Sequence, residues 1–284
     1  MQALEAISAR RGTAARTLIA QNETLAELRA AARLEPFRMQ RISADATLYR
    51  GTSFWRRRGL LVAVTGFQPR MQVSTAVFLQ AVPAGRWDVL MLRDPQKTHF
   101  RLGCEGFGDS LTALTARLVT IARGYPKVVV LGQSMGGLVA IRAALRVPGA
   151  RGVSFGGKPA NDIARLFETA GSFSAFDPLC ACLPKAARDM IFVYSEDHAA
   201  DAHAAQEYAA LVGGIAVPVA KMREHGTVLG LWKRGRLAQF LAIVLNLRLG
   251  TKVLPRALFA AVAWQPDDDS EAALTHRDGK PGDE

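Results

Sequence analysis

The sequence predicts an α/β fold: a mostly parallel, doubly wound sheet with helices on both faces. Short, continuously apolar segments rich in Val, Ile and Leu alternate with segments of helical periodicity, which is typical of parallel strands buried on both faces. The 284 residues are 49% hydrophobic and 21% charged. This composition suits a globular α/β domain and argues against global disorder.

The first 47 residues predict an N-terminal helical extension. In "LIAQNETLAELRAAARL", leucines and alanines recur at helical spacing, Asn22 or Thr24 can cap the helix, and Pro36 ends it. We therefore divide the chain into an extension (1–47), an α/β domain (48–250) and a C-terminal extension (251–284).

Six apolar segments in the α/β domain have the length and composition of strands. They are residues 60–66, 87–94, 127–132, 151–157, 189–195 and 214–222. Helical periodicity predicts the intervening helices, of which the clearest are 72–82, 110–123, 135–146 and a last helix ending at Gly250, a natural C-cap. In such a sheet, functional residues gather in loops beyond the carboxyl ends of the strands.

The net charge of +11 is unevenly distributed. Residues 265–284 hold seven acidic and two basic residues, a net charge of −5, so the rest of the chain carries +16. The tail is rich in Asp, Gly and Pro, and we expect it to be disordered. Basic flanks in residues 1–60 and 221–256 predict attraction to an anionic membrane surface, or only a solvated basic face; nucleic acid is not an expected partner.

The lack of a recognisable secretory signal and the cysteine usage both favour the cytoplasm. The basic flanks add the expectation of peripheral association at the inner membrane face. No apolar run is long enough to cross a bilayer, and the N-terminus lacks the pattern of a secretory signal. Three cysteines at Cys104, Cys180 and Cys182 show no framework spacing, which indicates reduced thiols.

Ser134 lies at a predicted corner between a strand and a helix. Gly132-Gln133-Ser134-Met135-Gly136 matches G-x-S-x-G, in which glycines remove the β-carbons that would collide in a sharp turn. The hydroxyl is then held above the sheet as a nucleophile. Residues 152–156 match the same pattern, but Ser154 falls inside a predicted strand with no helix after it. We expect Ser154 to be structural.

A serine nucleophile requires a base and an acid. Among five histidines, His225 follows the last predicted strand and precedes the final helix, which favours it as the base. The acid should follow the preceding strand, in "YSEDHAAD". Asp197 is our first choice, Asp201 the next, and Asp162 a weaker candidate after an earlier strand.

Two backbone amides are candidates for the oxyanion hole. The N–H of Met135 lies at the start of the predicted helix, where the helix dipole also favours negative charge. The second donor should come from the loop after residues 60–66. There we choose the N–H of Phe67, with that of Gln68 adjacent.

These motifs together resemble the α/β-hydrolase superfamily over about residues 60–249. The resemblance rests on the "VTGF" turn, the "GQSMGG" elbow, the "YSEDHAAD" loop and "EHGTVLGLWKRGRLAQFL", in the family order Ser, Asp, His. The usual His-Gly after the first of these strands is Thr65-Gly66 here. More weakly, "RDPQKTHFRLGCEGFGDSL" is similar to hydrolase-like proteins of bacterial surface-polysaccharide assembly, which implies an acylated glycan substrate.

The resemblance implies a serine esterase or acyl hydrolase acting on a small-molecule or glycan ester. The alternatives are an acyltransferase with a glycan acceptor and a catalytically silent scaffold that binds anionic partners. Asp197, His198, Asp201 and His203 offer metal-ligand types without a recognised motif, so we predict neither a metal nor a cofactor. The oligomeric state is left open.

Overall fold

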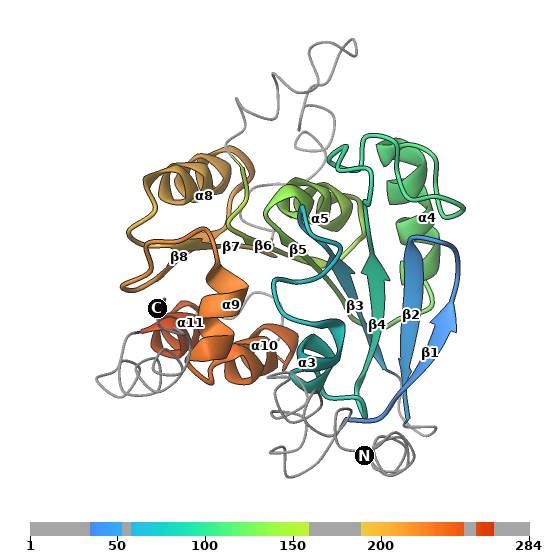
Figure 1. The fold of residues 1–284 in the computed structure, drawn as a ribbon, viewed down its shortest axis with the longest axis horizontal. Coiled ribbons are helices and arrows are strands. Elements are labelled where there is room, and N and C mark those ends of the chain that lie inside the picture. Colours follow the sequence, from blue (N-terminus) through green and yellow to red (C-terminus); the bar gives the residue numbers. More distant parts are fainter. Residues whose placement is uncertain (1–34, 53–57, 159–188, 247–253, 264–284) are drawn as a thin grey trace, which may run out of the picture.

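The computed structural model describes residues 35–52, 58–158, 189–246 and 254–263, and a twisted sheet crosses its centre (Figure 1). Within these residues the sheet has eight strands in the order β1-β2-β4-β3-β5-β6-β7-β8. The strands are β1 (Phe37–Arg41), β2 (Ala46–Gly51), β3 (Gly59–Val64), β4 (Trp87–Leu92), β5 (Val128–Gln133), β6 (Arg151–Phe155), β7 (Asp189–Ser195) and β8 (Ile215–Val219).

Six of these strands, from β4 to β8 across the sheet, run parallel. Every residue of β3, β4 and β5 is buried, because helices cover both faces. All six predicted strands are present. The register pairs Val64 with both Leu92 and Gly132, so the loops after β3, β4 and β5 leave the same edge of the sheet.

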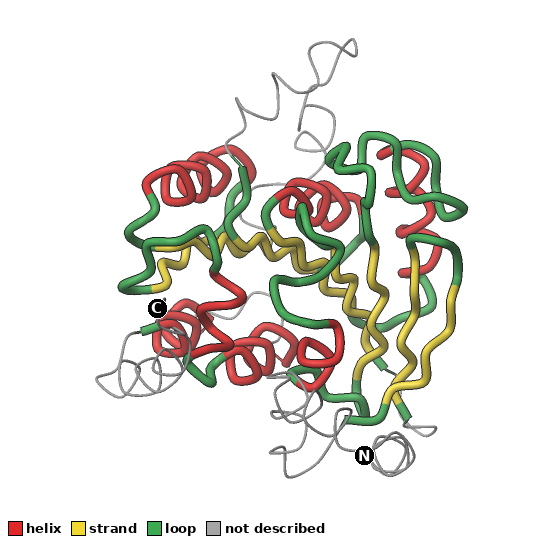
Figure 2. Tube along the Cα trace, in the orientation of Figure 1, coloured by secondary structure: helices red, strands yellow, loops and turns green. Residues whose placement is uncertain are grey.

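The helices form two layers, one on each face of the sheet (Figure 2). One layer holds α4 (Leu111–Ala122), α5 (Met135–Arg146) and α8 (Ala199–Val212); the other holds α3 (Thr75–Gln80), α9 (Thr227–Lys233), α10 (Leu237–Asn246) and α11 (Leu254–Val262). Each layer packs its own apolar cluster against the sheet. Among the described helices, none combines the length and the hydropathy that a bilayer-crossing segment requires. The predicted doubly wound α/β architecture is confirmed.

The N-terminal part of the sheet corrects the predicted helical extension. Residues 37–41 and 46–51 are strands, which pair antiparallel with each other, and β2 pairs antiparallel with β4. After Pro36, the chain gains more from hydrogen bonds along the edge of the sheet and from burying Leu48 and Tyr49 than from helical propensity. The predicted boundary at residue 48 therefore divides β2. Residues 1–34 lie outside the described residues.

The C-terminal boundary at residue 250 also excludes part of the domain. Leu258, Ala261 and Val262 of α11 are buried in the same apolar cluster as Phe240 and Leu241 of α10. The spacing of these residues puts one apolar face of α11 against the layer, so α11 is part of the fold. The acidic tail, 264–284, lies outside the described residues.

Candidate active site

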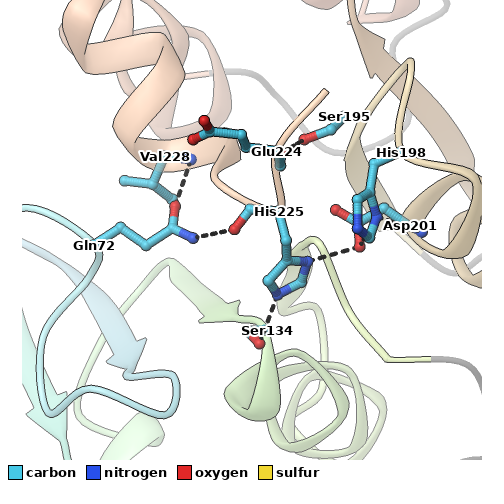
Figure 3. A network of polar contacts seen from close by, with 8 residues as sticks. All are labelled: Gln72, Ser134, Ser195, His198, Asp201, Glu224, His225 and Val228. Carbon is cyan, nitrogen blue, oxygen red and sulfur yellow. Dashed lines mark hydrogen bonds and ion pairs between the residues drawn. The ribbon is translucent and has the colours of Figure 1, made fainter. Parts of the chain in front are cut away.

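Ser134 occupies a strained turn between β5 and α5. Its φ of 50° and ψ of −113° lie in a region that side-chain-bearing residues rarely adopt. Glycines make the turn possible: a β-carbon on Gly132 would lie 2.1 Å from the carbonyl oxygen of Gly136, closer than any real contact. The turn places the Ser134 hydroxyl at the carboxyl edge of the sheet (Figure 3).

The turn around Ser134 also packs closely against the end of the neighbouring strand β3. This close packing predicts that a larger residue in the turn destabilises the fold. A β-carbon on Gly136 would lie 2.6 Å from the carbonyl oxygens of both Val64 and Thr65. We expect Gly136→Ala to lower the free energy of unfolding by about 1–3 kcal/mol, because overpacking displaces backbone. Urea denaturation measures this loss. Gly85→Ala is the control, since a β-carbon there meets nothing within 4 Å; equal stability of the two variants would contradict the packing argument.

His225 contacts Ser134 directly. The residue lies in the loop between β8 and α9, and its Nε2 is 2.8 Å from Ser134 Oγ. Ser134 is only 7% exposed, whereas the His225 side chain is 35% exposed, so the imidazole closes over the hydroxyl and still faces solvent. The structure thus brings together the nucleophile and the base that the sequence predicts.

Asp201 is the carboxylate that bonds the imidazole. Its Oδ1 accepts a hydrogen bond from His225 Nδ1 at 2.7 Å. Because an ionised carboxylate only accepts, Nδ1 carries the proton and Nε2 is left free to accept the Ser134 hydroxyl proton. The first choice from the sequence, Asp197, is therefore wrong as the partner of His225, and the second choice, Asp201, is the residue found there.

The geometry of α8 explains the correction. Asp197 is an exposed residue of the turn after β7, and its backbone N–H donates to the carbonyl oxygen of Met222. The helix begins two residues later. Asp201 in its first turn lies on the same face as Ala204, Ala205 and Tyr208, which are all buried. This i, i+3, i+4, i+7 pattern in the sequence identifies Asp201 as inward-facing, and it is the signal that could have found the acid.

His198 is a neighbour that the sequence analysis did not assign a role. Its Nδ1 lies 3.0 Å from Asp201 Oδ1 and 3.3 Å from the backbone nitrogen of Asp201. When Nδ1 is unprotonated it can accept from the Asp201 N–H; when protonated it can donate to the carboxylate. The His198 and His225 rings lie 5.7 Å apart, so two imidazoles flank one carboxylate oxygen.

Gly156, after β6, leaves room for the Asp–His pair. A β-carbon on it would lie 3.0 Å from both Asp201 Oδ2 and His225 Cε1, and its φ of +53° favours glycine as well. Asp201 is 3% exposed, and within the described residues its Oδ2 has no hydrogen-bond partner. The carboxylate is therefore buried directly beside the imidazole.

Both predicted oxyanion amides belong to segments that meet at the elbow. Met135 is the first residue of α5, and the loop after β3 passes so close that a β-carbon on Gly66 would lie 2.0 Å from Gln133 Oε1. Phe67 is 60% exposed, and Lys97 Nζ lies 3.9 Å from the centroid of its ring. The donor roles of Met135 and Phe67 stay predictions.

The remaining candidates lie elsewhere. Ser154 is a buried residue of β6, as expected of a structural serine. His99 follows β4, where burial, reinforced by the charge of Lys158, lowers its pKa. Asp162 lies outside the described residues. Four residues were considered as metal ligands. Two of them, Asp197 and His203, are exposed. The other two, His198 and Asp201, form a group with His225, and the potential ligand atoms of this group lie within 4.8 Å of one another.

These three residues have the side-chain types that can bind a cation, but both ring nitrogens of His225 already have protein partners. His225 is bonded on one ring nitrogen to a carboxylate and on the other to a hydroxyl. These contacts follow the order that the sequence analysis expects, with the carboxylate on one side of the imidazole and the hydroxyl on the other. Fold and site together define the α/β-hydrolase architecture with a Ser–His–Asp arrangement.

Comparison with solved structures supports the fold. The chain is similar to the acylaminoacyl peptidase of Pyrococcus horikoshii, with a TM-score of 0.53 and 12% identity, covering 84% of this chain and 46% of that one. It is also similar to 2,6-dihydroxy-pseudo-oxynicotine hydrolase, with a TM-score of 0.50 and 15% identity, covering 75% of this chain and 69% of that one. The chain thus spans less than half of the peptidase.

A second structure described as an acylaminoacyl peptidase, in complex with Z-Gly-Gly-Phe-chloromethyl ketone, gives a TM-score of 0.52 at 10% identity over 82% of this chain and 45% of that one. No protein-family model matches the chain, and no curated protein matches its sequence. The α/β-hydrolase fold is therefore supported by three-dimensional similarity, as the sequence motifs predicted. The resemblance to polysaccharide-assembly proteins is not tested by these comparisons.

Proposed function

We propose that the protein is a serine hydrolase that cleaves ester bonds through an acyl-enzyme on Ser134. The observation that carries the proposal is the unbroken chain of hydrogen bonds from Ser134 through His225 to Asp201. Its members come from three separate segments at the carboxyl edge of the sheet: the turn between β5 and α5, the first turn of α8, and the loop between β8 and α9. This edge is where sites form in this fold class. Nothing in packing alone requires a hydroxyl, an imidazole and a carboxylate to align there.

The chemistry assigned to each residue follows from these contacts. Ser134 Oγ attacks the carbonyl carbon while its proton passes to His225 Nε2, and the Nδ1–H bond to Asp201 stabilises the imidazolium. As the ester C–O bond breaks, His225 returns the proton to the departing alcohol. Water then loses a proton to Nε2 and attacks the acyl-enzyme, and Oγ takes the proton back as the acid is released.

Two backbone amides would stabilise the negative charge that forms on the carbonyl oxygen. The N–H of Met135 belongs to the first turn of α5, where orphan donors and the helix dipole both favour an anion. The N–H of Phe67 would supply the second donor. The loss of one such donor typically costs about 2.7–4 kcal/mol of transition-state stabilisation.

The structural neighbours are named as hydrolases and peptidases, which agrees with the proposal. At 10–15% identity they support the fold, and the substrate class has to come from other observations. The proposed substrate, a small-molecule or glycan ester, rests on the sequence resemblance. Peripheral binding to an anionic membrane surface through the basic flanks likewise stays a proposal.

Acyl transfer is the second candidate. The His225 side chain is 35% exposed, so the base faces solvent, from which either water or an alcohol can enter in the second step. The same triad then serves both reactions, with a glycan hydroxyl in place of water. A catalytically inactive scaffold is less favoured, because binding alone does not require Ser134, His225 and Asp201 to be aligned by hydrogen bonds.

An ester panel tests the proposal. We expect the purified full chain to hydrolyse short-chain p-nitrophenyl esters with a burst of p-nitrophenol, followed by a slower steady state as the acyl-enzyme turns over. Intact mass spectrometry should show the acylated protein during the burst. Adding a glycan acceptor distinguishes the two candidates, since acylated glycan forms only by transfer. If no ester gave a burst, turnover or acylated protein, the result would favour the scaffold.

A further inference from the structure

The Gln72 side chain contacts the loop that carries His225, which is distant in sequence (Figure 3). It lies between β3 and α3, 153 residues before His225. Its Nε2 donates to the backbone carbonyl oxygen of His225 at 3.0 Å. Its Oε1 accepts from the backbone N–H of Val228 at 3.0 Å and from that of Leu229 at 3.3 Å. A single side chain thus contacts the His225 residue and the helix that follows it.

The backbone holds Gln72 in place at a conformational cost. Its φ of 60° lies in the left-handed region, which is unfavourable for a residue other than glycine. The two neighbours, Met71 and Val73, are 0% and 4% exposed and anchor the loop in the core. Between these anchors the Gln72 side chain is directed at the histidine loop. Such strain persists only where the surroundings enforce it.

Helix α9 depends on this contact for its N-terminal cap. The N-cap residue is Gly226, which has no side chain to accept from the free N–H groups of the first turn. Oε1 of Gln72 accepts from Val228 and Leu229, the second and third residues of the helix. Gln72 therefore does, from a distant segment, what a serine or aspartate cap does locally.

We propose that Gln72 is a positioning residue for the His225 base, and that it ties the base to the loop that supplies the Phe67 amide. This inference rests on the proposed function. Gln72 touches no reacting atom; it acts through the backbone of His225. Since residues 65–74 contain both Phe67 and Gln72, the predicted oxyanion donor and the base are joined by one short segment.

A second contact shows that the backbone beside His225 is fixed from the opposite direction. Ser195 at the end of β7 is fully buried, and its Oγ donates to the carbonyl oxygen of Glu224 at 2.6 Å. Two successive carbonyls, those of Glu224 and His225, are therefore held by side chains from different elements (Figure 3). Because His225 is an exposed loop residue, these bonds compensate for the little packing around it.

Gln72→Glu separates the two contacts. One carboxylate oxygen can still accept from Val228 and Leu229, and its charge suits a helix N-terminus. The other oxygen faces the His225 carbonyl with no proton to donate, so two acceptors repel. We expect kcat for p-nitrophenyl ester hydrolysis to fall about 10²-fold, since a misplacement of about 1 Å can cost that much. KM and the midpoint of thermal unfolding should stay near the wild-type values.

Two further variants complete the design. Gln40→Glu is the matched control, because it makes the same charge change on the exposed strand β1, where Gln40 Oε1 accepts from Arg50. It should leave kcat and the unfolding midpoint unchanged. Gln72→Met removes both contacts at similar size. We expect it to lower kcat at least as much as Gln72→Glu and also to lower the unfolding midpoint, through the lost cap.

The NMR resonances of the His225 imidazole provide a readout independent of turnover. We expect them to shift in Gln72→Glu and not in Gln40→Glu. A kcat for Gln72→Glu within twofold of wild type would overturn the inference, as would a loss of kcat with unmoved His225 resonances. If the wild type hydrolyses no ester, the proposed function fails by itself, and the resonances alone decide whether Gln72 positions His225.

Discussion

Replacing Ser134 with alanine should remove ester hydrolysis almost entirely. Ser134 Oγ lies 2.8 Å from His225 Nε2, and within the described residues it is the hydroxyl bonded to that imidazole. Without it no acyl-enzyme forms, and loss of a nucleophilic serine typically lowers kcat by about 10⁶-fold. Steady-state kinetics with a p-nitrophenyl ester measures the loss. His225→Ala should cost about as much, because the pair acts as a unit.

Ser154→Ala is the control for this prediction. Ser154 lies in the other G-x-S-x-G match, but it is a buried residue of β6. We expect its activity to remain close to that of the wild type once the folded fraction is taken into account. If Ser134→Ala kept more than a few per cent of the wild-type kcat while Ser154→Ala lost it, the nucleophile would be misassigned.

Asp201→Asn should have the next largest effect, a fall in kcat of about 10⁴-fold. The carboxylate fixes the proton on His225 Nδ1, across a 2.7 Å bond, and thereby leaves Nε2 free to accept. An amide can donate from the same position and so favours the opposite tautomer. The change keeps the size of the side chain, so the fall should appear in kcat with the thermal midpoint little changed.

Asp197→Asn is the matched control, four residues earlier and exposed. It makes the same chemical change without touching the imidazole, and we expect its kcat to be within about twofold of wild type. The comparison is sharp, since the two variants have the same charge. Loss of activity in Asp197→Asn with retention in Asp201→Asn would contradict the assignment of the acid.

Much of the fold could be predicted from local patterns. The strands that end at Val64, Gln133 and Ser195 are short, mostly apolar runs, and their burial on both faces is what such runs indicate. The strands at residues 37–41 and 46–51 were not predicted, because both are short and are held by antiparallel pairing: β1 lies at the exposed edge against β2, and β2 lies between β1 and β4. Local periodicity carries no information about that pairing.

The site divides in the same way. Ser134 and His225 could be placed because each follows a recognisable strand and the glycines around Ser134 have a steric reason. Asp197 was preferred to Asp201 because the expected acid was placed directly after β7, and the first turn of α8 was not weighed as an inward-facing element. Gln72 could not have been found, since its contacts join residues more than 150 positions apart.

The most direct measurement is the site of labelling by a fluorophosphonate, which reacts with activated serines. We predict a single adduct on the peptide containing Ser134, found by mass spectrometry after digestion of the folded chain, and no adduct in Ser134→Ala or after unfolding in urea. An adduct on a different residue, or an unlabelled wild type that is demonstrably folded, would contradict the claim that His225 and Asp201 activate the Ser134 hydroxyl.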